Sequence, residues 1–175
     1  MGYGIMIHNS KNIKLHDLKV HDMTGDGIII QDSMSSGKNL TDTIDIYDNK
    51  IYNNRRQGIS IICGKNINIK RNEIYNIKGN PPQAGIDIEP DDNYHKISNV
   101  VITNNNIHDT KGYSVSLGVC PNHLSSITIK NNTNDKPVQY CSTVKNIVIS
   151  GNTKDKENIS NNCINDNNHG TGCNG

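Results

Sequence analysis

One short segment recurs six times along the chain, and this repetition limits the possible folds more than any other feature. It reads GIMIHN at 4–9, GIIIQD at 27–32, GISIIC at 58–63 and GIDIEP at 85–90, with weaker copies SVSLGV at 114–119 and PVQYCS at 137–142. Successive copies begin 23, 31, 27, 29 and 23 residues apart. Repeats of this length indicate a solenoid with a constant core and loops of variable length.

A second segment with alternating apolar residues follows each copy, as strands with one buried face require. These segments lie at 12–22, 43–53, 66–76, 99–109, 126–135 and 146–155. The pattern predicts an all-β chain that resembles the single-stranded right-handed parallel β-helix, with about six coils over 1–155. Residues 156–175 lack the alternation, and we expect a C-terminal cap or flexible tail there.

The composition agrees with this fold, since the 175 residues include 27 Ile and 29 Asn but one Ala and five Leu. Such a chain is a poor helix former, and Asn with 15 Gly favours turns. One Asn also holds the same position in five successive coils. We therefore expect a ladder of stacked Asn side chains, formed by Asn49, Asn72, Asn105, Asn132 and Asn152.

Several classes of partner receive no support from the sequence. The net charge is +1 with scattered positive residues, so we expect no nucleic acid partner. No apolar run approaches the length of a membrane span, and no signal peptide precedes the first strand. Five cysteines argue against a fully paired disulfide framework; Cys63 reads as a core residue, while Cys163 and Cys173 could pair.

The chain opens directly in a strand at GYGIMI, with no capping element. An uncapped solenoid exposes a sheet edge and core residues. We therefore expect either a fragment of a longer protein, a domain that covers this end, or an assembly. Ile29 and Ile62, apolar residues predicted on the outer face, are the sequence's hint of a homo-oligomer such as a trimer.

The stretch AGIDIEP places two acids on an otherwise buried strand. Ile86 and Ile88 must face inward, so Asp87 and Glu89 face outward, roughly 6.6–7 Å apart along the backbone. Stacking of the coils predicts a patch along the first sheet, open as a shallow groove suited to an extended polymer. Its other members, from neighbouring columns and turns, would be His8, Asp26, Gln31, Arg55, Arg56, Ser60, Gln83 and Ser116.

Each of these residues also has an ordinary structural explanation. Exposed strand acids are usually just solvated, and paired arginines usually add solubility or bind acids. Tyr47, Tyr52 and Tyr75 are assigned to packing or surface, so the outer face looks poor in the aromatic platforms that sugars favour.

The pairing of RRQGISI with AGIDIEP one coil later resembles β-helix repeat proteins of bacteria and phages, the pectate-lyase-like and tailspike-like proteins. The resemblance covers roughly 4–155. It implies an extracellular, cell-surface or virion location and a polysaccharide partner. The chain lacks the acid-rich motifs of the polygalacturonase-like hydrolases and the calcium and arginine signature of pectate lyases, so the fold alone leaves the reaction open.

Three functions remain open. A hydrolase would use Asp87 and Glu89 as acid and base, with Arg56 and Asp26 beside them. A lyase or epimerase would use Arg55 or Arg56 as base or clamp, with calcium on Asp87 and Glu89. A glycan-binding or structural spike would have no chemistry, and the missing cap favours it. The residues favour the hydrolase slightly over the lyase.

Overall fold

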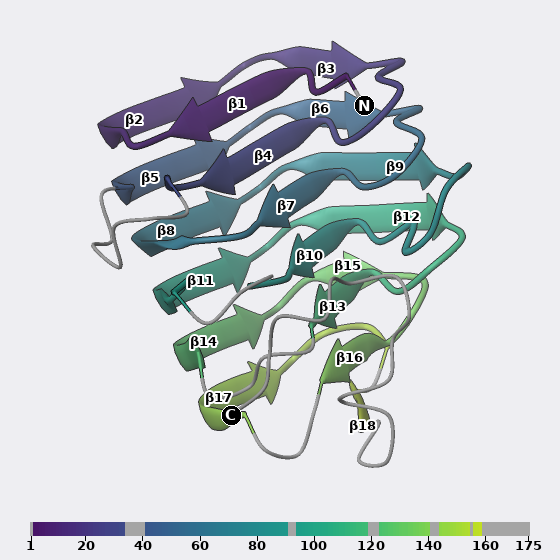
Figure 1. The fold of residues 1–175 in the computed structure, drawn as a ribbon. Coiled ribbons are helices and arrows are strands. Elements are labelled where there is room, and N and C mark those ends of the chain that lie inside the picture. Colours follow the sequence, from purple (N-terminus) through teal and green to yellow (C-terminus); the bar gives the residue numbers. More distant parts are fainter. Residues whose placement is uncertain are drawn as a thin grey trace.

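In the computed structural model, the chain forms a parallel β-helix whose coils stack in one direction, from β1 at the N-terminal end to β18 (Figure 1). The structure describes residues 2–33, 41–90, 94–118, 123–140, 144–154 and 156–158. All the regular elements in these ranges are strands, and they form three parallel sheets. The predicted all-β solenoid is therefore confirmed.

Each of the first five coils contributes one strand to each of the three sheets, always in the same order along the chain, and the last three strands extend two of the sheets. Sheet A contains seven strands: β1 (Ile5–His8), β4 (Ile28–Gln31), β7 (Ile59–Ile61), β10 (Ile86–Ile88), β13 (Val115–Leu117), β16 (Val138–Tyr140) and β18 (Lys156–Asn158). Sheet B contains six: β2 (Lys11–His16), β5 (Asp42–Tyr47), β8 (Gly64–Lys70), β11 (Ile97–Thr103), β14 (Leu124–Lys130) and β17 (Lys145–Ser150). Sheet C contains five: β3 (Lys19–His21), β6 (Lys50–Tyr52), β9 (Glu73–Ile77), β12 (Asn106–Thr110) and β15 (Thr133–Asn134).

The core is built from columns of isoleucine that repeat from coil to coil. In sheet A, Ile28 pairs with Ile59 and Ile59 with Ile86, and all three are fully buried. The glycine before each of these strands is needed for close stacking. A Cβ added at Gly58 would lie 2.4 Å from the carbonyl oxygen of Gly85 and 2.5 Å from the Ile74 side chain. The recurrent GI pair in the sequence thus reflects contact between neighbouring coils.

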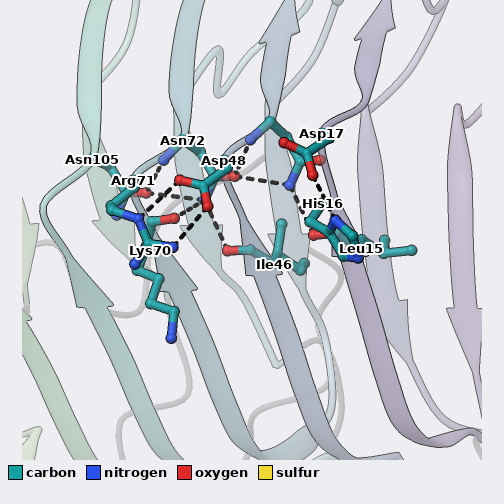
Figure 2. Close-up of polar contacts among 10 residues, drawn as sticks. Leu15, His16, Asp17, Ile46, Asp48, Lys70, Arg71, Asn72 and Asn105 are labelled. Atoms are coloured by element: carbon teal, nitrogen blue, oxygen red, sulfur yellow. Dashed lines mark hydrogen bonds and ion pairs between the residues drawn. The ribbon is translucent and has the colours of Figure 1, made fainter.

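The predicted Asn ladder lies in the turn between sheets B and C. Asn72 donates from Nδ2 to the Oδ1 of Asn105 at 3.0 Å and to the carbonyl oxygen of Ile46 at 2.9 Å. Its own Oδ1 accepts both the backbone N–H and the Nδ2 of Asn49, at 3.1 and 2.9 Å. Figure 2 shows Asn72 and Asn105 at adjacent positions beside the exposed Asp48–Arg71 ion pair. The same pattern continues through Asn132 to Asn152.

The residue before each ladder Asn has left-handed backbone, which brings the Asn side chain under the turn. Its φ is 57° at Asp48, 54° at Arg71, 56° at Asn104 and 55° at Asn131. Asn and Asp adopt this conformation more readily than most residues, which accounts for their abundance in the turns. A second left-handed column crosses the strands of sheet B and includes Thr43 at 61°, a β-branched residue for which this conformation is unusual.

Two expectations about the ends and the outer face are changed by the structure. Residues 156–158, expected in a cap or tail, form β18 and pair with β16; residues 159–175, including Cys163 and Cys173, lie outside the described residues. Ile29 and Ile62 are 4% and 6% exposed in the single chain. Their burial is already achieved within the single chain, so these two residues no longer indicate an oligomer, and the homo-oligomer stays a prediction. No helix within the described ranges could span a membrane.

The ladder yields a test of what aligns the coils. Replacing Asn72 by Ala removes its two donated ladder bonds and leaves buried backbone groups of Ile46 and Asn49 without their side-chain partner. We expect the free energy of unfolding to fall by about 2–4 kcal/mol, since stranded buried polar groups cost about 1–3 kcal/mol each. Urea denaturation would measure this change.

The matched control is Asn68→Ala. Asn68 lies in the same coil as Asn72, on strand β8, and its side chain donates one partly buried hydrogen bond to Asp45. Its effect should stay below about 1 kcal/mol. Equal losses in the two variants would show that the ladder has no special role.

Candidate functional site

A cluster of charged and polar side chains lies on the outer face of sheet A, at the start of the strands. Asp26 and Arg56 come from the turns that precede β4 and β7, while Ser60 lies on β7. Asp87 lies on β10 directly opposite Ser60, and Glu89 follows β10. Residues up to 63 positions apart in sequence are thus assembled by three successive coils.

Arg56 is the centre of this cluster because one guanidinium binds two carboxylates. Its Nη1 donates to both oxygens of Asp26, at 3.0 and 3.3 Å. The same Nη1 and the neighbouring Nη2 donate to the two oxygens of Glu89, at 3.1 and 3.0 Å. The Arg56 side chain is 16% exposed, whereas those of Asp26 and Glu89 are 0% and 3% exposed. Arg56 is therefore the member through which the cluster meets solvent.

Gln57 links Asp87 and Ser60 to Arg56, and it was not among the residues predicted for the site. Its Nε2 donates to Oδ2 of Asp87, and its Oε1 accepts from Arg56 Nη1 at 3.2 Å and from the Ser60 hydroxyl. Ser60 Oγ also lies 2.8 Å from Oδ2 of Asp26. Gln57 is fully buried. Gln57 stands between Arg56 and the recurrent GI pair in RRQGI, but an uncharged amide gives no indication of chemistry by itself.

Burial governs the ionisation of the cluster. Desolvation raises the pKa of Asp26 above its ordinary value, even though the charge of Arg56 and the Ser60 hydrogen bond act to lower it. For Arg56, desolvation acts to lower the pKa, but the charges of Glu89 and Asp26 outweigh it and raise the pKa. Arg56 therefore stays charged, and Asp26 takes up a proton more readily than an exposed aspartate.

The two acids of AGIDIEP lie on the outer face, as the alternation predicts, but they are not exposed. Asp87 is 0% exposed and Glu89 is 2% exposed, and Ser60 beside them is also fully buried. The expectation of an open groove at these carboxylates was wrong. The turns that precede the strands bring Arg56 and Gln57 over the sheet, and these side chains bind the acids instead of leaving them to solvent.

Other residues predicted for the site make their contacts elsewhere. Arg55 is exposed and reaches Asn80 at 3.5 Å, so of the arginine pair Arg56 is the one that binds the acids. The His8 ring lies 3.3 Å from Ser33 Oγ, and Gln31 contacts the sulfur of Met6 at 3.4 Å. Ser116 shares the Asp87 column but donates to Gln139 at 2.9 Å. Gln83 is buried in the turn before β10, where its carbonyl oxygen accepts from Gly112.

A metal site at Asp87 and Glu89 receives no support. Within the part of the chain that the structure describes, no group of three or more His, Cys, Asp or Glu side chains is arranged to hold a metal ion. The space between Asp26 and Glu89 is taken by the guanidinium of Arg56, which supplies the positive charge there.

A second chemical feature lies on the outer face of sheet C. The rings of His21, Tyr52, Tyr75 and His108 stack in one row, with centroids 4.7–5.1 Å apart and planes within 11° of parallel. The end rings His21 and His108 each bind the aspartate that follows them. Although the chain has few aromatic residues, two of its tyrosines and two of its histidines are therefore concentrated in one row on this face.

Comparison with known proteins identifies the architecture. Residues 3–175 match the family model described as "Right handed beta helix region". The chain is 30% identical over 149 residues to the "Uncharacterized protein YclG" of Bacillus subtilis (strain 168), a match that covers 79% of this chain and 25% of the relative. The chain thus corresponds to about a quarter of that protein's length. No solved structure shows a significant match.

The ion cluster gives a prediction about stability. Replacing Arg56 by Met leaves the buried Asp26 and Glu89 without the guanidinium that bridges them. Breaking a buried ion pair from one side costs about 3–5 kcal/mol. We expect a loss of that size by urea denaturation at neutral pH, and a smaller loss as the pH falls through the raised pKa of Asp26, because protonation removes a buried negative charge.

Arg55→Met is the matched control, since it makes the same change one residue earlier on an exposed side chain. It should change the unfolding free energy by less than about 1 kcal/mol. A similar small effect for Arg56→Met would contradict the role assigned to the cluster.

Proposed function

We propose, from the premise that this chain belongs to the right-handed β-helix family, that it is a glycan-cleaving module whose chemistry resides in the Asp26–Arg56–Glu89 cluster. The supporting observation is the pair of carboxylates held on one guanidinium at the outer face of sheet A. Glycoside hydrolysis requires two such carboxyl groups with different protonation states.

The spacing of the two carboxyls supports a particular version of this chemistry. Oδ2 of Asp26 and Oε1 of Glu89 lie 3.0 and 3.1 Å from the same nitrogen of Arg56, so the two oxygens are at most about 6 Å apart. This upper limit lies below the ~6.5–9.5 Å window of inverting enzymes and is compatible with the ~5–5.5 Å of retaining enzymes. Asp26 and Glu89 therefore replace Asp87 and Glu89 as our preferred pair.

The residues can be given distinct roles. Asp26, whose pKa burial raises, would donate a proton to the glycosidic oxygen as the bond to the anomeric carbon breaks. Glu89, bound by two N–H groups of Arg56, would attack the anomeric carbon as the nucleophile. Asp26 would then take a proton from the water that releases the sugar. Gln57 fixes Asp87 beside this pair.

Access is a requirement of this proposal. Asp26 and Glu89 are buried, so a sugar reaches them only when the cluster opens, and the partly exposed Arg56 is the group it would meet first. Cleavage by elimination would need Arg56 as a base or clamp, but the two carboxylates already engage it, which is why hydrolysis is preferred.

A second candidate function is favoured by different observations. A glycan-binding or structural module with no catalysis fits the complete burial of Asp26, Asp87 and Glu89, which would then stabilise the turns. The row of rings on sheet C would offer a surface for a polymer that runs along the rod. Either function suits an extracellular, cell-surface or virion protein with a polysaccharide partner.

The deciding experiment is digestion of a polysaccharide panel by the natural protein, Asp26→Asn and Glu89→Gln. We expect new reducing ends without ultraviolet absorbance from unsaturated products, and a loss of at least about 100-fold in each variant. Asp45→Asn, on the partly exposed face of sheet B, is the control and should keep full activity. The products should retain the anomeric configuration of the substrate, which proton NMR can follow.

Other outcomes assign the alternatives. Absorbance of unsaturated products would establish elimination and overturn the hydrolase. Glycan binding without cleavage, preserved in both variants and lost in Tyr52→Ala, would establish the binding module. Activity unaffected by Asp26→Asn would remove Asp26 from the proposed pair.

The proposal also predicts a direction of pH dependence. Asp26 must be protonated to act as the acid, so kcat/KM should fall as the pH rises above its pKa, which lies above the ordinary aspartate value. In Arg56→Met the charge that lowers this pKa is removed, so the alkaline limb of any residual activity should move to higher pH. A shift to lower pH would contradict the assignment of Asp26 as the acid.

A further inference from the structure

The hydroxyl of Ser60 lies between two oxygen atoms that both accept hydrogen bonds. One is Oδ2 of Asp26 at 2.8 Å, and the other is the side-chain oxygen of Gln57. A serine hydroxyl has a single hydrogen to donate. When Asp26 is ionised, Ser60 can satisfy one of these oxygens but not both.

The orientation of the Gln57 side-chain amide decides which oxygen receives the single hydrogen of the Ser60 hydroxyl. Its Nε2 faces Asp87 and its Oε1 faces Arg56 Nη1, so the amide oxygen is the atom that faces Ser60. With its hydrogen directed to Gln57, Ser60 can only accept from Asp26. Both contacts of Ser60 are then satisfied if Asp26 carries a proton on Oδ2.

We infer that Ser60 and Gln57 are positioning residues that hold a proton on Asp26, through the directed chain Asp26 to Ser60 to Gln57 to Asp87. With Asp26 ionised, the Ser60 hydroxyl donates to its Oδ2 at 2.8 Å; with Asp26 protonated the same contact reverses, and each group then donates to the next until the chain ends on a carboxylate oxygen of Asp87. Arg56 Nη1 lies 3.3 Å from Oδ1 of Asp26 and 3.0 Å from Oδ2, so with the proton on Oδ2 the ionised-type acceptor left for Arg56 is Oδ1.

The other charged groups that face Asp26 agree with this choice of residue. Both oxygens of Asp26 and both oxygens of Glu89 accept from Arg56, and Oδ2 of Asp87 accepts from Gln57, so these contacts suit a carboxylate at each of the three positions. Asp26 alone among the three acids has the Ser60 hydroxyl as a neighbour in the described contacts. The arrangement therefore favours Asp26 as the first of them to take up a proton when the pH falls.

The inference deepens the proposed function, because it explains how the general acid would keep its proton. Its catalytic meaning rests on that proposal, but the protonation itself does not. It can be measured in the free protein without any substrate, so failure to find an activity would leave the measurement unaffected.

The test is a pH titration of the aspartate side-chain carbons by carbon-13 NMR, with the Asp26 signal assigned from its absence in Asp26→Asn. In the natural protein Asp26 should titrate above the ordinary aspartate range. Gln57→Leu leaves Ser60 free to donate its hydrogen to the ionised form, so the Asp26 midpoint should fall by about half to one pH unit. This shift is informative because Gln57 does not itself contact Asp26.

Ser60→Ala gives a second test, because the direction of the shift in the Asp26 midpoint depends on whether Ser60 accepts from Asp26 or donates to it. If Ser60 mainly accepts from protonated Asp26, its removal lowers the midpoint; if Ser60 mainly donates to the carboxylate, its removal raises the midpoint. The control is Gln139→Leu, since Gln139 accepts from Ser116 in the same kind of pair, on the same sheet but away from Asp26. It should leave the Asp26 titration unchanged.

Three results would overturn the inference. They are an Asp26 midpoint at or below the ordinary range in the natural protein, a rise of the midpoint in Ser60→Ala, and an unchanged midpoint in folded Gln57→Leu. If Gln57→Leu does not fold, the natural protein and Ser60→Ala decide the matter between them.

Discussion

The alignment of one coil on the next is the constraint on which the rest of the structure depends. Columns of isoleucine fill the interior, and the Asn ladder fixes the coils through paired side-chain and backbone bonds. Because the register is fixed, residues about 23–31 positions apart become neighbours on the outer face. The cluster around Arg56 exists only because three coils are aligned in this way.

That cluster combines the burial of side chains with the charge of ionisable groups, and burial usually opposes charge. Burying Asp26 and Glu89 costs solvation free energy, and Arg56 offsets this cost only while its hydrogen bonds to both remain intact. The same burial raises the pKa of Asp26, the property that the proposed function assigns to a general acid. A stabilising ion network and the proposed general acid with its partner carboxylate are therefore two uses of one geometry.

The sequence was sufficient for the features that repeat and insufficient for those that occur once. The strands and the Asn ladder could be predicted because every coil carries the same signal, and the outward direction of Asp87 followed from alternation. Its burial could not be predicted, because it depends on turns that differ in each coil. The choice of Arg56 over Arg55, and the role of Gln57, depend on the path of one such turn. The ring row was missed because Tyr52 and Tyr75 were assigned to packing or surface without being aligned with His21 and His108.

The most direct test of the account is a double-mutant cycle between Asp26 and Glu89, measured by urea denaturation in the natural background and again with Arg56→Met. Asp26→Asn and Glu89→Gln change the charges while they preserve the shapes. If Arg56 unites these residues, their effects on unfolding free energy should be non-additive by about 1 kcal/mol or more, and this coupling should change sharply without Arg56. Additive effects in both backgrounds would show that the two carboxylates are independent, and the account of a single acid–base cluster would be wrong.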